Sequence, residues 1–151
     1  MNAECHDPAT PLLVRRADQT PEQQVAVLLR GAGADPEDVA DLLRRRGVLI
    51  LSDLTLPPTA PPLAAVAFRV DRRAGIAHLI AIGVLEARRR RGLGRRLLTG
   101  SLTVLRAEGV DRVDAWAQPG TAGSSLLVSA GFTACHYTAH ADGARRLELL
   151  L

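Results

Sequence analysis

The chain has 151 residues, of which 47% are apolar and only 3% aromatic, and its formal net charge is +3. This length predicts one domain over residues 11–151, preceded by a flexible tail over residues 1–10. All 19 basic residues are arginine, but the scarcity of stacking aromatics argues against a nucleic-acid partner. The absence of lysine excludes acetylation of the protein's own lysine side chains.

The two cysteines, Cys5 and Cys135, are too few for a disulfide framework and lack the spacing of metal ligands. We therefore expect no bound metal, and we expect Cys135 to be a buried, inert thiol. No apolar run approaches the ~18 residues of a membrane span, and the N-terminus lacks an apolar signal core. The expectation is a cytoplasmic protein with no membrane partner.

Hydrophobic periodicity and turn residues divide the chain into alternating helices and strands. Pro21 and Pro36 suit the first positions of two early helices, which Gly31 and Gly47 end. The predicted elements, in order, are a strand over 11–16, helices from 21 and from 36, strands over 48–54, 63–70 and 76–84, a helix over 92–108, a strand over 110–117, a helix over 121–130, and strands over 132–140 and 144–151. This order, β-α-α-β-β-β-α-β-α-β-β, predicts an α/β fold with one mixed sheet and helices on both faces.

The segment most informative about chemistry is IGVLEARRRRGLGRRLL, residues 82–98. An apolar strand ends at Val84, and Arg89-x-x-Gly92-x-Gly94 then opens a helix with a stripe of leucines. The glycines allow a tight turn and close approach of a ligand, and the helix start offers free amides and a positive dipole end. The pattern predicts a pyrophosphate site. Leu97 stands where a dinucleotide fingerprint needs a third glycine, and a Walker loop would need lysine.

This segment resembles motif A of the GNAT superfamily of acyl-CoA-dependent N-acyltransferases, and the element order from about Pro11 to Leu151 resembles that family too. The resemblance implies a mostly antiparallel central sheet that splays after the fourth strand. It also implies that the backbone of Ile82, Gly83 and Val84 holds the acyl group and pantetheine of acetyl-CoA. The pyrophosphate would be held by the amides of the turn and helix start, namely Arg89, Arg90, Arg91, Gly92, Leu93, Gly94 and Arg95.

A general base is expected on the strand before motif A, because the attacking amine must lose a proton. Some family members place a glutamate eleven residues before the first arginine of the motif, and here that position is His78. Imidazole suits the role, with an ordinary pKa of ~6.5. Strand alternation predicts that His78 shares a face with Ile80, Ile82 and Val84.

The general acid is less directly indicated by the resemblance. Family members often carry a tyrosine four residues before a Gly-Phe pair, but here that position is Leu127, and Gly120 replaces an asparagine that often opens the helix. Tyr137 is the single tyrosine of the chain and becomes the candidate acid. Ser124, Ser125 or solvent are the alternatives.

Two functions fit these observations. The first is an N-acetyltransferase that moves acetyl from acetyl-CoA to a primary amine on a small molecule or a protein, with a homodimer compatible with the family. The second is a non-catalytic module of the same fold that binds CoA or a regulatory partner. On the strand after motif A, Trp116 fits either the core or the border of the acceptor site, and Asp114 is expected to be an exposed surface residue.

Overall fold

The computed structural model describes residues 11–151 except positions 19, 33, 58, 140 and 141, and except the side chains of residues 136–139. The element order predicted from the sequence is confirmed. In order, the elements are β1 Leu12–Arg16, α1 Glu22–Gly31, α2 Pro36–Arg44, β2 Val48–Asp53, β3 Ala64–Asp71, β4 Ile76–Val84, the short 3-10 helix Glu86–Arg88, α3 Leu93–Ala107, β5 Arg112–Ala117, α4 Ala122–Ser129, β6 Thr133–Ala139 and β7 Arg145–Leu150.

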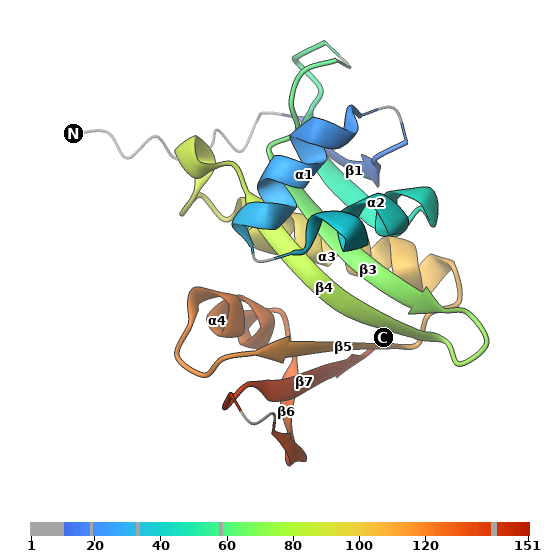
Figure 1. The fold of residues 1–151 in the computed structure, drawn as a ribbon, viewed down its shortest axis with the longest axis vertical. Coiled ribbons are helices and arrows are strands. Elements are labelled where there is room, and N and C mark those ends of the chain that lie inside the picture. The colour runs from blue at the N-terminus through green and yellow to red at the C-terminus, as the bar shows by residue number, and fades with distance from the viewer. Residues whose placement is uncertain (1–10, 19, 33, 58, 140–141) are drawn as a thin grey trace.

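All seven strands form one sheet in the order β1-β2-β3-β4-β5-β7-β6 (Figure 1). Every neighbouring pair is antiparallel except β4 and β5, which are parallel. The connection between these two strands carries α3, as a crossover between parallel strands requires. The sheet is therefore mixed and mostly antiparallel, as predicted.

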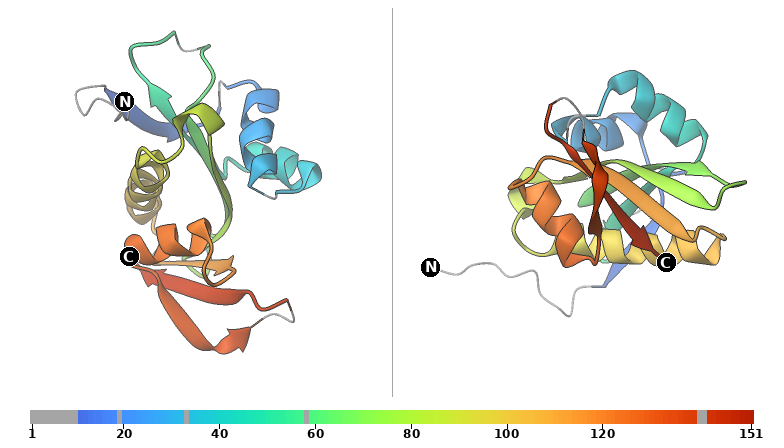
Figure 2. Two further views of the ribbon diagram at one scale, coloured as in Figure 1. Left: turned by 90° about the vertical axis from the view of Figure 1, so that its left-hand side faces the viewer. Right: turned by 90° about the horizontal axis from the view of Figure 1, so that it is seen from below.

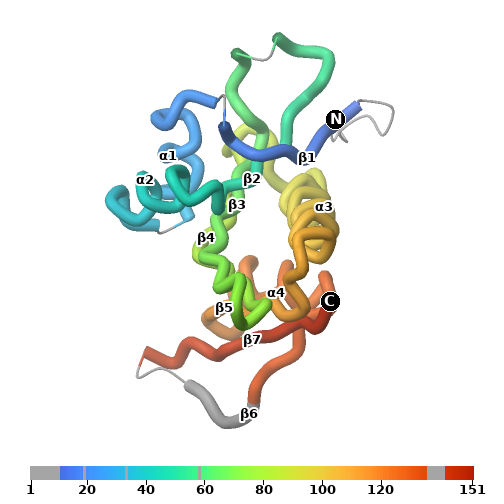
Figure 3. The backbone as a smooth tube through the Cα atoms, turned by 90° about the vertical axis from the view of Figure 1, so that its right-hand side faces the viewer, coloured from blue at the N-terminus to red at the C-terminus, as the bar shows by residue number. Residues whose placement is uncertain are grey.

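Helices cover both faces of this sheet. Two further views show α1 and α2 on one side and α3 on the other, with α4 near β5 (Figures 2 and 3). The core divides accordingly, and β3 supplies both halves: Val66 and Phe68 pack toward α3, while Ala65 and Ala67 pack toward α1 and α2. Burial of both faces explains why β3 is apolar along most of its length.

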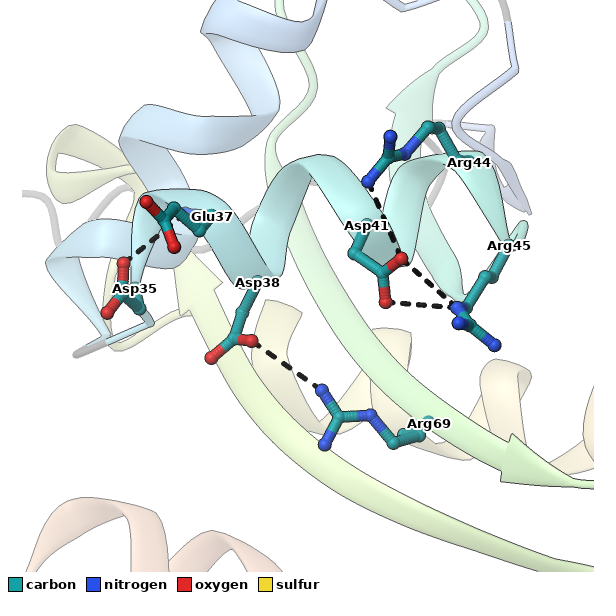
Figure 4. A network of polar contacts seen from close by, with 7 residues as sticks. All are labelled: Asp35, Glu37, Asp38, Asp41, Arg44, Arg45 and Arg69. Carbon is teal, nitrogen blue, oxygen red and sulfur yellow. Dashed lines mark hydrogen bonds and ion pairs between the residues drawn. The ribbon is translucent and has the colours of Figure 1, made fainter.

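The ends of the two early helices differ in detail from the expected ones. The N-terminal cap of α1 is Pro21 and makes no side-chain capping bond, whereas Asp35 caps α2 by accepting from the Glu37 amide at 3.3 Å (Figure 4). After α2, Arg46 adopts the left-handed conformation (φ 57°). Gly47 is needed for another reason, because a Cβ there would lie 2.2 Å from the Phe68 carbonyl oxygen.

Candidate functional site: the splayed end of the central sheet

The predicted strand–turn–helix segment is present. After β4 ends at Val84, the chain passes through the short 3-10 helix and turns into α3. Two left-handed residues shape the turn, Arg90 at φ 63° and Gly92 at φ 74°. Gly92 is the N-terminal cap of α3 and makes no side-chain capping bond. Its positive φ is one that glycine adopts without strain.

The start of α3 leaves amide donors free of helical partners. The Arg96 amide donates to the Gly92 carbonyl at 3.0 Å. The amides before it, from Leu93 to Arg95, belong to the first turn and have no acceptor within the helix. Together with the positive end of the helix dipole, they form a site suited to phosphate groups.

The strands β4 and β5 separate beside this turn. Their pairing runs from Ile76 opposite Arg112 to Leu79 opposite Ala115 and stops there, although β4 continues to Val84. A cavity of about 860 Å³ occupies the resulting opening. Its lining comes from the end of α1, β4, the turn, the start of α3, the end of β5 and α4. It includes Leu28, Gly31, Ala32, Leu79–Val84, Arg89, Arg90, Gly92–Arg95, Trp116–Gln118, Thr121–Gly123, Leu126 and Leu127.

All of the residues predicted to bind the cofactor line this cavity except Arg91. The side chain of Arg89 folds back, and its Nε donates to the Val84 carbonyl at 3.3 Å. On the opposite wall, a Cβ at Gly94 would contact Val84 Cγ2 at 3.4 Å and Leu126 Cδ2 at 3.5 Å. Glycine at this position thus keeps the passage between β4 and α4 open.

His78 does not line the cavity, and the prediction for its strand face was partly wrong. The register of β3 and β4 shifts by one residue here, because Phe68 is opposite Leu79 whereas its neighbour Ala67 is opposite Ala81. Ile80 packs toward α1 and α2, but Ile82 and Val84 pack into the core beside α3. Strand alternation fails because a β-bulge inserts one residue and reverses the face of everything that follows.

His78 instead belongs to a polar row across three strands. Its Nδ1 contacts Oδ1 of Asp114 on β5, and Oδ2 of Asp114 accepts from Nη2 of Arg146 on β7 at 2.9 Å. The Asp114 side chain is only 6% exposed, so the expectation of an exposed surface aspartate was wrong. No local signal could have found this group, because it depends on the register of strands more than thirty residues apart in the chain.

The remaining predicted residues are distributed around the site. Tyr137 lies on β6, but its side chain is outside the described part of the structure, as are Cys5 and all of residues 1–10. Trp116 is 45% exposed and lines the cavity, so it borders the opening rather than the core. Leu127, at the position where a tyrosine is usual, is buried and also lines the cavity.

No group of three or more potential metal-binding side chains occurs among the described residues. None of the described helices is long and apolar enough to cross a membrane. Cys135 is a free cysteine of intermediate exposure, so it is less buried than the sequence suggested. Burial raises the pKa of its thiol, and a hydrogen bond to Glu148 adds to the increase.

Comparison with known proteins connects this geometry to one family. The sequence model described as the acetyltransferase (GNAT) family matches residues 41–132, which include β4, the turn and α3. No curated protein sequence matches the chain. Many solved structures share its fold.

Three of these structures illustrate the likeness. The ribosomal-protein-S18-alanine N-acetyltransferase from Escherichia coli is 21% identical, with a TM-score of 0.69 over 93% of this chain and 94% of the other. A Bacillus subtilis acetyltransferase in complex with CoA is 18% identical, with a TM-score of 0.73 over 93% and 99%. Tetrahymena GCN5 is 17% identical, with a TM-score of 0.68 over 93% and 95%. At these identities the likeness shows a shared fold.

Proposed function

Because the chain belongs to the acetyltransferase (GNAT) family, we propose that it transfers an acetyl group from acetyl-CoA to a primary amine by direct attack. One observation carries this proposal. The glycine turn at the start of α3 opens onto a cavity that follows the unpaired end of β4. In acetyl-CoA a charged pyrophosphate is joined to a narrow, partly apolar pantetheine arm that carries the acetyl group, and this cavity offers surroundings suited to both.

The pyrophosphate would bind at the turn, where the amides of Leu93 to Arg95 have no helical acceptor. Arg90 and Arg95 also line the cavity, and their guanidinium groups would add charge-assisted hydrogen bonds. Bound in this way, acetyl-CoA supplies an activated thioester.

The pantetheine arm and the acetyl group would lie along β4. The backbone of Ile82, Gly83 and Val84 has no partner strand on the β5 side. Peptide groups at an unpaired strand edge need hydrogen-bond partners. The amides and carbonyl groups of pantetheine can provide them, so this strand edge would hold the arm in an extended conformation.

His78 would act as the general base. An amine substrate arrives mostly as ammonium and must lose one proton to the imidazole before its nitrogen can attack. The nitrogen then forms a bond to the thioester carbon, the C–S bond breaks, and CoA leaves as a thiolate. The nitrogen loses its second proton during this collapse, the thiolate takes up one proton, and the net release is one proton for each acetyl group transferred.

The donor of the thiolate proton remains a separate prediction. Tyr137 is the candidate, with Ser124, Ser125 or solvent as alternatives. A Tyr137→Phe variant that retained full kcat would eliminate the tyrosine, and the same change that lowered kcat while leaving the KM for acetyl-CoA unaltered would support it.

A second function, a CoA-binding module without turnover, is favoured by one observation. Leu127 is buried at the cavity wall, so no hydroxyl is available at the position where related enzymes often carry their acid. Such a module would use the same turn and the same cavity, and would bind CoA without releasing a thiol.

Two measurements on the full chain test these functions. Calorimetry measures the binding of acetyl-CoA, and a thiol reagent then detects free CoA during incubation with small primary amines, amino acids and a peptide with a free N-terminus. Binding with thiol release that depends on the amine is the expected result. Binding with no release to any amine would leave the module, and absence of binding would overturn both functions.

A further inference from the structure

The polar row of His78, Asp114 and Arg146 crosses strands β4, β5 and β7. On β5, Val113 and Ala115 pack into the core next to α3, so strand alternation places Asp114 on the opposite face. Its side chain is nevertheless only 6% exposed, compared with 47% for His78 and 27% for Arg146. Carboxylates are rarely buried to this extent unless they are paired.

Both carboxylate oxygens of Asp114 are engaged, one by His78 Nδ1 and the other by Arg146 Nη2. A buried carboxylate with both oxygens occupied has little capacity left to bind a cationic substrate. Asp114 therefore acts on its two neighbours, and not on the acceptor amine directly.

The contact with Asp114 determines which nitrogen of His78 carries the proton. An ionised carboxylate only accepts hydrogen bonds, so Nδ1 must be the donor. In the neutral ring the other nitrogen, Nε2, then has a free lone pair. Arg146 contributes by holding the second carboxylate oxygen, which keeps the first one facing the imidazole.

The row of His78, Asp114 and Arg146 also lies next to the point where β4 and β5 separate. His78 is opposite Asp114 in the parallel register, one pair before Leu79 and Ala115, where β4 and β5 separate. Leu79 lines the cavity, as does Trp116, which is two residues beyond Asp114 on the same strand. The half-exposed imidazole is thus placed beside the end of the opening that lies farthest along β4 from the glycine turn.

We propose that Asp114 and Arg146 are positioning residues that hold His78 in the tautomer protonated at Nδ1, so that Nε2 takes the proton from the acceptor amine. This inference rests on the proposed acetyl transfer. In the step, one N–H bond of the ammonium breaks and an Nε2–H bond forms, and the neutral imidazole becomes imidazolium. The positive charge formed on the ring is stabilised by the adjacent carboxylate.

Asp114→Asn is the decisive variant. Arg146 can only donate, so it holds the amide oxygen and leaves the amide nitrogen, also a donor, facing His78. Nδ1 must then accept, and the ring proton moves to Nε2. The change preserves shape and removes only the feature that sets the tautomer.

Asp38→Asn is the matched control. Asp38 on α2 pairs with Arg69 on β3 at 3.6 Å (Figure 4), and Arg69 is opposite His78 in the sheet register. The control therefore removes one carboxylate charge close to His78 without touching its ring, and it should change neither the tautomer nor kcat.

The first measurement is the tautomer of His78 from its ring ¹⁵N chemical shifts at about pH 8.5, two units above the ordinary imidazole pKa of ~6.5, with the signals assigned by His78→Gln. The second is kcat and KM for acetyl transfer. We expect an Nδ1–H tautomer in the native protein, its inversion in Asp114→Asn, and a loss of about 10²–10⁴ in kcat with little change in the KM for acetyl-CoA.

An Nε2–H tautomer in the native protein, or inversion of the tautomer with kcat retained, would overturn the inference. A loss of kcat without inversion would assign Asp114 a purely structural role and would overturn it too. If the native protein transferred acetyl to no amine, the proposed function would fail together with the catalytic part of the inference, and the NMR result would still decide whether Asp114 sets the tautomer.

Discussion

Replacement of Gly92 by alanine tests whether the turn before α3 holds the acetyl donor. Gly92 adopts φ 74° and has no atom within 4 Å of where a Cβ would be, so the change introduces backbone strain without a collision. Gly109, at the other end of the same helix, has φ 92° and equally open surroundings. Gly109→Ala is therefore a control matched in strain and in space, at the end of α3 that lies away from the turn.

The structure gives the magnitudes. A left-handed conformation costs an L-residue about 1–2 kcal/mol, so both variants should lose about this much free energy of unfolding. For a domain of this size that corresponds to a decrease in Tm of about 2–8 °C. Only at Gly92 would relief of the strain rotate a peptide group at the proposed phosphate site. Loss of one charge-assisted hydrogen bond there costs about 1.5–3 kcal/mol, which raises the Kd for acetyl-CoA by about 10–150-fold.

Calorimetry with acetyl-CoA, combined with thermal unfolding of each variant, separates the two effects. We expect similar decreases in Tm for Gly92→Ala and Gly109→Ala and a weaker Kd for Gly92→Ala alone. A Kd for acetyl-CoA in Gly92→Ala equal to that of the native protein would refute the assignment of the turn to the donor. Equal losses of affinity would show that α3 transmits instability to the site, and would refute the reasoning as well.

Three further predictions concern packing and ionisation. Gly83→Ala should cost about 1–3 kcal/mol or prevent folding, because its Cβ would lie 2.1 Å from the Leu28 carbonyl oxygen; unfolding in urea measures this. Ser101→Ala should raise Tm by about 2–4 °C, because the buried Ser101 hydroxyl has no hydrogen-bond partner among the described residues; calorimetric scanning checks it. Cys135 should be alkylated more slowly than an unfolded cysteine near pH 9, because burial and Glu148 raise the pKa of its thiol and reduce the thiolate. In a variant without the other cysteine, Glu148→Gln should accelerate that alkylation, since it removes the negative charge that raises the pKa of the thiol.

The order of elements and the strand–turn–helix segment that opens α3 were predictable because their signals are local. The leucine stripe of α3, the glycines at 92 and 94 and the apolar run of β4 each lie within a few residues of one another. The helix start, the strand end and the turn between them form from neighbouring positions, so their relative placement follows from chain connectivity. The parallel pairing of β4 and β5 then follows, because the α3 crossover joins them.

The position of His78 was harder to predict because a bulge leaves no distinct mark in the sequence. The run Leu79-Ile80-Ala81-Ile82 is apolar throughout and fits either face of a sheet that is buried on both sides. The inserted residue becomes visible only when β4 is aligned with β3, where Ala67 is opposite Ala81 and Phe68 is opposite Leu79. Alternation counted from His78 is therefore correct at Ile80 and wrong beyond it.

The same dependence on strand register explains why the burial of Asp114 was not predicted. It also separates the two proposed halves of the site. The residues proposed to hold the donor, from Ile82 to Arg95, come from one continuous segment, so a short pattern can specify them. The half proposed to move the proton needs His78, Asp114 and Arg146 from three strands, and their contact depends on two registers, one parallel and one antiparallel. A chain could retain the glycine turn and lose this row through a single substitution. The turn therefore argues for binding of the donor, whereas the carboxylate buried beneath the imidazole argues for catalysis.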